Sequence, residues 1–171
     1  MALAGKLPSL EHLIALFNYN PKTGLLIRAK TVRGRGSVVG AIVGTPNSDG
    51  HLVCKIDYQI YYVHRIIWKI FYGEEPPPIL DHKNRKNTDN RIDNLRPATA
   101  FQNGCNKNIS KRNLTGIVGV SFCKQMKRWK SHIKANGINI HLGYHHKKED
   151  AITARRKAER KLHKEYAHSN V

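Results

Sequence analysis

The chain has 171 residues, 40% of them hydrophobic and 25% charged, so it can bury at least one core and is not a disordered tail. Its 30 Lys and Arg against 12 Asp and Glu give a formal net charge of +18, which favours a polyanionic partner such as nucleic acid. No apolar stretch reaches the length of a membrane span or a secretory signal, so we expect a soluble, cytoplasmic protein without a membrane partner.

The first part of the chain predicts a helix, a small antiparallel β platform and a second helix. Ser9 is a suitable N-cap, and the apolar residues that follow it up to Phe17 fall at helical spacing. The second helix is expected over Val63–Tyr72, ending at Gly73 before three prolines. Segments that alternate or are rich in β-branched residues predict the strands between them: Leu25–Lys30, Val38–Val43, Leu52–Tyr58 and Tyr61–Ile67.

The segment from Ile79 to Asn108 is rich in Asn, Asp and Arg. Such a polar segment buries little apolar surface, so its order has to come from hydrogen bonds or from a bound ion. We therefore expect the chemistry of the protein to lie there.

The order of polar residues in this segment resembles the HNH nuclease motif of phage and intron-encoded proteins. Asp81-His82 is followed by Asn94-Leu95 and then by Asn103, with Asn94 twelve and Asn103 twenty-one residues after His82. An upstream His64-Arg65 pair completes the pattern of that branch. Together with the glycine-rich strands before His64, the resemblance covers about residues 9 to 108.

The resemblance implies a role for each of these residues in phosphodiester hydrolysis. His82 is expected to be the general base, because an imidazole titrates near neutral pH and can take a proton from water. Asp81 and Asn103 are expected to bind a divalent metal through hard oxygens, with Mg²⁺ favoured and Mn²⁺ as an alternative. Asn94 is expected to be structural support for the loop that holds the base.

The remaining candidates have two interpretations. His64 and Arg65 either contact phosphate and brace the site or only pack and pair locally. The three cysteines are widely separated and form no CxxC pair, so we expect free thiols and no structural zinc. No small-molecule cofactor is expected.

The C-terminal part carries a net charge of +11 in the 62 residues after Ile109 and predicts three strands and a helix. The strands are expected at Gly116–Phe122, Arg128–Ala135 and Ile138–Leu142, and the helix at Glu149–Tyr166. The apolar side of this helix is expected to carry Ala151, Ala154, Ala158 and Leu162, and Arg155 is expected on its charged sides. Several short motifs here, including Arg128-Trp129-Lys130 and His141-Leu142-Gly143-Tyr144, resemble the APETALA2-type DNA-binding domain of plant ethylene-response factors. The predicted DNA-binding residues are basic and lie on the first two strands and their turn: Lys124, Lys127, Arg128, Lys130, His132 and Lys134. Strand alternation places Trp129, Ser131 and Ile133 on the opposite face, where Trp129 either packs in the core or reaches DNA.

Together these patterns predict an α+β protein with an HNH endonuclease domain at 1–108, a linker at 109–114 and an APETALA2-like domain at 115–171. The expected activity is metal-dependent hydrolysis of duplex DNA by a homing-type nuclease, as a monomer or homodimer in a bacterial or phage-infected cell. The main alternative is a non-catalytic DNA-binding transcriptional regulator, because charge does not separate a nuclease from a binding protein. An RNA-binding or ribosome-associated protein is a third possibility.

Overall fold

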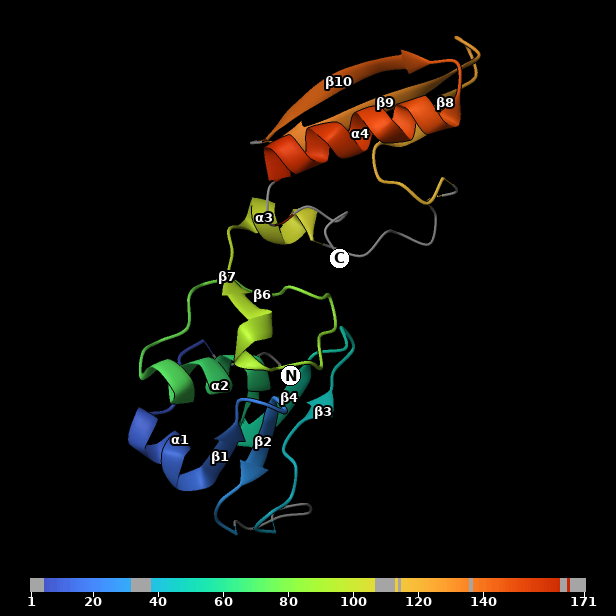
Figure 1. The fold of residues 1–171 in the computed structure, drawn as a ribbon. Coiled ribbons are helices and arrows are strands. Elements are labelled where there is room, and N and C mark those ends of the chain that lie inside the picture. Colours follow the sequence, from blue (N-terminus) through green and yellow to red (C-terminus); the bar gives the residue numbers. More distant parts are fainter. Residues whose placement is uncertain are drawn as a thin grey trace. The chain divides into compact units, whose positions relative to one another are not determined.

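In the computed structural model the chain is an α+β protein, as predicted, with several small antiparallel sheets. The structure describes residues 5–31, 38–106, 113, 115–135, 137–163 and 166. The chain divides into two compact units, Met1–Pro97 and Ala98–Val171 (Figure 1). Of the predicted linker at 109–114, all but residue 113 lies outside the described residues.

The N-terminal unit contains two helices, a 3₁₀ turn and three small antiparallel sheets. The sheets are the β1-β2 pair, the three strands in the order β3-β4-β5, and the β6-β7 pair. The elements, in chain order, are α1 (Leu10–Leu16), β1 (Phe17–Asn20), β2 (Leu25–Arg28), β3 (Thr45–Pro46), β4 (Leu52–Ile56), β5 (Gln59–Tyr62), α2 (Val63–Tyr72), β6 (Leu80–His82), the turn Ile92–Asn94 and β7 (Leu95–Pro97).

Helix α1 begins where predicted, because the Ser9 side chain accepts a hydrogen bond from the His12 backbone N–H at 3.2 Å. It ends one residue earlier than the apolar spacing indicated. Phe17 has extended backbone angles and starts β1, so its ring enters the core from a strand and not from the helix. The periodicity alone could not separate these two arrangements.

The prediction of a strand at Val38–Val43 is wrong. Gly40 adopts a left-handed conformation (φ 84°), which turns the chain within the segment. Only Ile42 forms a bridge, to Ile27, and the short strand β3 begins two residues after Val43. A glycine inside a strand-like pattern was the signal for this interruption.

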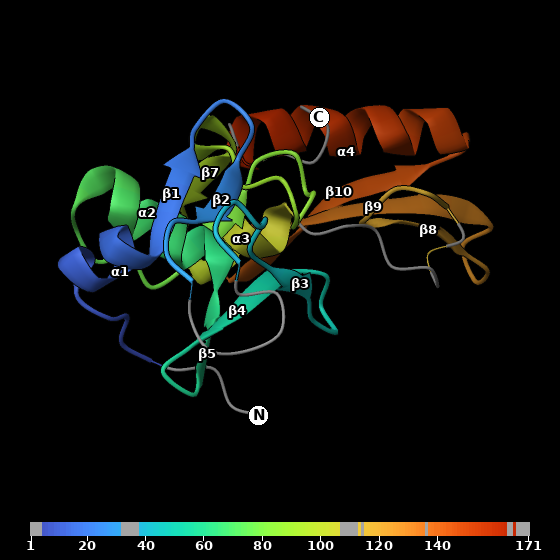
Figure 2. The same ribbon diagram turned by 90° about the horizontal axis from the view of Figure 1, so that it is seen from below.

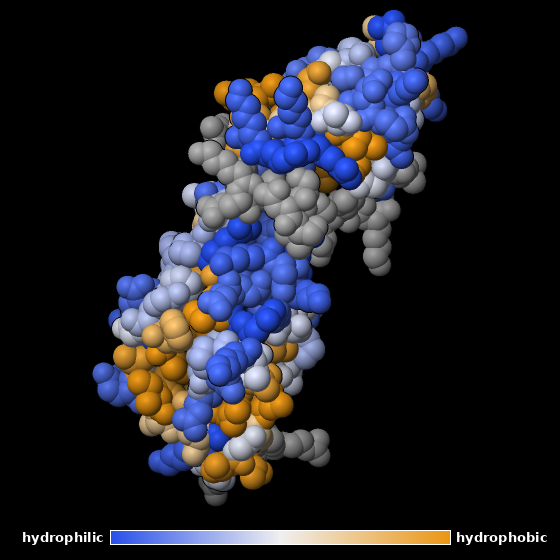
Figure 3. Space-filling model, viewed as in Figure 1, coloured by the Kyte–Doolittle hydropathy of each residue, from blue (hydrophilic) through white to orange (hydrophobic). Residues whose placement is uncertain are grey.

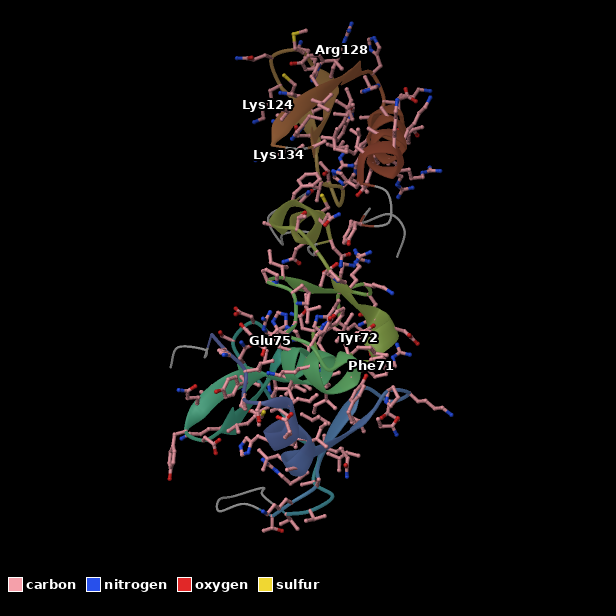
Figure 4. The ribbon with its side chains drawn as sticks, turned by 90° about the vertical axis from the view of Figure 1, so that its left-hand side faces the viewer. Phe71, Tyr72, Glu75, Lys124, Arg128 and Lys134 are labelled. Atoms are coloured by element: carbon pink, nitrogen blue, oxygen red, sulfur yellow. The ribbon has the colours of Figure 1, made fainter. Side chains whose placement is uncertain are left out.

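Helix α2 organises the core of the N-terminal unit. Val63, Ile66 and Ile67 are almost completely buried, and the helix ends at Gly73, whose φ of 76° provides the left-handed C-cap. Figure 3 shows hydrophobic residues gathered over α1 and α2 on the visible face of this unit. The exposed rings of Phe71 and Tyr72, labelled in Figure 4, lie at the end of α2.

The C-terminal unit begins with a short helix and continues as a three-stranded antiparallel sheet with a long helix on one face. Figure 2 shows β8, β9 and β10 side by side with α4 along them. No helix among the described residues is long and apolar enough to cross a bilayer. The elements are α3 (Ala100–Cys105), β8 (Val120–Cys123), β9 (Arg128–Ala135), β10 (Ile138–His145) and α4 (Lys148–His163).

The buried side of α4 differs from the alanine-lined side that its sequence predicts. Ala151 is buried as expected, but the next buried positions are Arg155, Glu159 and His163, and Leu162 is exposed. Arg155 pairs with Glu159 (Nη1 to Oε2, 3.2 Å), and the His163 ring lies 3.0 Å from the Lys134 carbonyl oxygen. The sequence pattern placed Arg155 on a solvated side because it did not anticipate that an ion pair would make burial of the charge tolerable.

Candidate active site

The β6-β7 hairpin brings the Asp81-His82 dipeptide into the interior of the N-terminal unit. All three residues of β6 are buried. The register pairs Asp81 with Arg96 and His82 with Leu95. Strand β7 therefore runs antiparallel beside β6, the strand that carries the predicted base His82 and the predicted metal ligand Asp81.

Asp81 forms a buried ion pair with Arg96. The Nε and Nη2 atoms of Arg96 each lie 2.9 Å from Oδ2 of Asp81. Both donors meet the same carboxylate oxygen, so the pair fixes the orientation of the carboxylate and balances its charge inside the protein. The sequence analysis did not single out Arg96, because its role depends on the strand register.

His82 is held by Asn90, a residue that the sequence analysis did not assign. His82 Nε2 lies 2.9 Å from Asn90 Oδ1, and both side chains are buried. Because an amide oxygen only accepts hydrogen bonds, this contact is a hydrogen bond when Nε2 of His82 carries the proton. Burial lowers the pKa of His82 below its ordinary value, while Asn90 and nearby Asp81 oppose the shift. Burial therefore favours the neutral form of the ring.

Asn94 ties together the loop between β6 and β7. Its Nδ2 donates to the Asp89 carbonyl at 2.7 Å and to Asn84 Oδ1 at 3.0 Å. Its Oδ1 accepts from the Asn84 backbone N–H at 3.0 Å. Arg91 binds the Asp89 carboxylate in the same loop, and this hydrogen bond is the main reason that the pKa of Asp89 falls to about 2. These are the contacts that a structural role for Asn94 requires.

Two further histidines surround His82. The ring centroid of His64, from the first turn of α2, lies 5.2 Å from that of His82, and the centroid of His51 lies 5.7 Å from it. Burial lowers the pKa of His64 well below its ordinary value and that of His51 to a smaller extent. His51 precedes β4 and has no motif of its own, so only the fold could place it here.

Arg65 braces the loop that leads into β6. Its guanidinium donates to the carbonyl oxygens of Pro76, Pro77 and Pro78, at 3.4, 2.9 and 3.3 Å. The chain therefore reaches Leu80 along a path fixed from α2. This geometry favours the bracing interpretation of Arg65 over direct phosphate contact.

Asn103 lies on α3, in the C-terminal unit. The helix begins at a capping box, in which the Thr99 side chain accepts from the Gln102 backbone N–H and the Gln102 side chain accepts from that of Thr99. This cap fixes the start of the helix, with Asn103 in its first turns. Its role as a metal ligand remains a prediction.

Residues 61–105 match the HNH endonuclease family model. The matched segment contains all of the motif residues that the sequence analysis selected: His64, Arg65, Asp81, His82, Asn94 and Asn103. At the level of the family, the match supports nuclease activity on DNA.

Protein 3.8 of Escherichia phage T7 is 29% identical to this chain over 75 residues. The aligned part is 43% of this chain and spans 62% of the phage protein. No solved structure matches the chain.

HNH nucleases generally depend on a divalent metal, and the donor chemistry near His82 fits one kind of ion. Asp81 offers a carboxylate, which is a hard-oxygen ligand. Mg²⁺ binds through one or two hard oxygens and keeps waters and substrate phosphate as its other ligands. Structural zinc uses four nitrogen or sulfur ligands, and no group of three His, Cys, Asp or Glu side chains in the described part of the chain is arranged to hold a metal.

In the C-terminal unit the predicted DNA-binding residues of β9 share the face that α4 leaves open. Ser131, Ile133 and Ala135 are buried, while the alternate residues of the strand are more exposed. Figure 4 shows Lys124, Arg128 and Lys134 on the sheet, away from the helix. The residues with this placement or in the adjoining turn are Lys124, Lys127, Arg128, Lys130, His132 and Lys134.

Trp129, which the sequence left ambiguous, belongs to the opposite face of the sheet. Its ring makes an edge contact with Phe122, with centroids 5.3 Å apart, and the Lys148 ammonium lies 5.7 Å from its centroid. Figure 3 shows hydrophilic residues predominating on the side of this unit that carries α4. Exposed basic residues of α4, namely Arg156, Lys157, Arg160 and Lys161, therefore place positive charge on this side as well.

Proposed function

We propose that the protein is a metal-dependent DNA endonuclease of the homing type, in which His82 is the general base. The observation that carries the proposal is the geometry of β6. A buried imidazole within hydrogen-bond distance of a side-chain amide lies next to a carboxylate on the β6-β7 hairpin, inside the segment that matches the HNH endonuclease family model. A binding protein has no need for such a base beside a hard oxygen donor.

In the proposed reaction, Nδ1 of His82 takes a proton from the attacking water as the water oxygen bonds to phosphorus. The phosphorus–oxygen bond to the leaving group breaks, and that oxygen receives a proton. Asp81 and Asn103 would hold Mg²⁺ or Mn²⁺, which when bound supplies a Lewis acid for the charge that develops on the phosphate oxygens. Asn94 and Arg65 keep the two ends of the hairpin in place.

The C-terminal unit is proposed to bind duplex DNA through the open face of its sheet. Its basic side chains stand on alternate positions of β9, a spacing that lets several of them meet one nucleic acid surface. The APETALA2 resemblance is part of this proposal, and it would place the three-stranded sheet in the major groove. Tethered binding would raise the local concentration of DNA at the nuclease site.

A single base and one metal in each chain would cut one strand at a time. A monomer is therefore expected to nick duplex DNA, and a homodimer would be needed to cut both strands in one encounter. The matched protein 3.8 comes from a phage, and homing is the specific role that we propose for this chain.

The test is cleavage of supercoiled plasmid at moderate salt, with Mg²⁺, with Mn²⁺ and with chelator. The wild-type protein should relax the plasmid only with a metal, and His82→Ala should abolish cleavage while retaining DNA binding. His12→Ala is the matched control, because His12 lies in the same unit but pairs with exposed Asp57. Binding without cleavage by the wild-type protein, under all metal conditions and on several DNAs, would instead identify a DNA-binding regulator.

A further inference from the structure

Asn90 is held on three sides although no motif singles it out. It lies in the loop between β6 and β7 and is only 1% exposed. Its Oδ1 meets His82 Nε2 at 2.9 Å, and its carbonyl oxygen accepts a hydrogen bond from the Tyr19 hydroxyl at 3.0 Å. Burial raises the pKa of Tyr19 to about 12, so this hydroxyl keeps the proton that it donates.

The turn between β1 and β2 makes the third contact with Asn90. A Cβ atom at Gly24 would lie 2.5 Å from the Arg91 backbone nitrogen and 2.8 Å from the Asn90 carbonyl carbon. The absence of a side chain at Gly24 therefore allows the turn to press directly on the backbone of Asn90. Tyr19 lies in β1 and Gly24 is the last residue of the turn before β2, so the β platform fixes the position of the loop residue that contacts His82.

The side chain of Asn90 is also incompletely satisfied. Its Nδ2 is buried and has no hydrogen-bond partner among the described residues. A buried amide donor without a partner is destabilising, so a stabilising role does not explain this side chain. The only side-chain hydrogen bond of Asn90 within the described part of the chain is the one to His82.

We propose that Asn90 is a positioning residue that fixes the tautomer of His82, accepting the Nε2 proton so that Nδ1 is the nitrogen that receives the proton from water. This inference rests on the proposed nuclease function for its consequence, but the tautomer itself is a property of the protein without DNA. Tyr19 and Gly24 act through Asn90 and hold its backbone. The N-terminal platform thus serves as the support of the base.

The first test is nitrogen-15 NMR of the metal-free, DNA-free protein at pH 8, where the imidazole is neutral. The His82 resonances, assigned by their loss in His82→Gln, should report a proton on Nε2. A proton on Nδ1 would overturn the proposal. Because this measurement needs no cleavage, a failure of the proposed nuclease activity would leave its outcome readable.

The second test compares two variants of nearly the same size as the natural residue. Asn90→Asp keeps an acceptor for Nε2–H and should retain the wild-type tautomer and most of the nicking activity. Asn90→Leu removes the acceptor, so the tautomer should become mixed and kcat should fall about 10- to 100-fold with little change in KM. If Asn90 instead donates through Nδ2, the Asp variant will lose activity, and this result refutes the proposal even if the Leu variant does not fold.

Discussion

Replacement of Arg96 by Met tests how much the buried ion pair at the site contributes to stability. Met retains much of the apolar stem of Arg but removes both donors to Asp81 Oδ2. The side chains of Arg96 and Asp81 are 10% and 6% exposed, so solvent cannot take over the lost interaction. Removing one partner of such a buried pair costs about 3–5 kcal/mol, and we expect Arg96→Met to lower the free energy of unfolding by that amount.

The assay is urea unfolding followed by tryptophan fluorescence in a Trp129→Phe background. The chain has two tryptophans, one in each unit, so this background leaves Trp68 as the reporter of the N-terminal unit. A double-mutant cycle with Asp81→Asn should give a coupling energy near the upper end of the usual range of about 0.5–3 kcal/mol. A loss below about 1 kcal/mol for Arg96→Met, with no coupling, would refute the account of the pair as a buried structural contact.

Three further predictions follow from the same structure. Because burial lowers the pKa of His64, the unfolded chain binds more protons than the folded one as pH falls below about 6.5, and the free energy of unfolding should fall by at most about 1.4 kcal/mol per pH unit. His64→Gln should reduce this slope, measured by urea unfolding with chelator. A free energy of unfolding that does not change with pH would contradict the prediction. Gly24→Ala should destabilise the N-terminal unit more than Gly50→Ala, since both have a left-handed backbone but the nearest atom to a Cβ at Gly50 is 3.9 Å away; equal thermal shifts would exclude the proposed close contact. Lys134→Ala should reduce the slope of log DNA-binding constant against log salt concentration by about 1, while Lys157→Ala, on the exposed side of α4, should leave that slope unchanged. A reduced slope for Lys157→Ala and an unchanged slope for Lys134→Ala would place DNA on the helix.

Residue type and spacing were enough to select the motif residues, and their catalytic and metal-binding roles remain predictions. Asp81, His82 and Asn94 were selected from the sequence alone, and the alternation of β9 correctly separated the basic face from Ser131 and Ile133. A motif records the residues that act on the substrate and the strand period records which side they face. Both kinds of information are local along the chain.

The supporting residues were not predictable, because their contacts depend on how distant segments meet. Arg96 reaches Asp81 through the strand register, Asn90 reaches His82 through the path of a loop, and His51 approaches from another sheet. On α4 the ion pair between Arg155 and Glu159 allows the side of the helix that carries these charges to be buried, whereas the positions of the alanines predicted a different buried side. In each case a pairwise interaction in three dimensions overrode the preference of the single residue.

The most direct measurement of the central claim is the nicking rate of His82→Ala with and without added imidazole. Loss of a positioned base lowers the rate of proton transfer steps by about 10²- to 10⁴-fold, and free imidazole can occupy the space that the side chain leaves. The account predicts that the variant is inactive at pH 8 with Mg²⁺ and that imidazole restores part of the nicking. Nicking by His82→Ala at the wild-type rate without imidazole would contradict it.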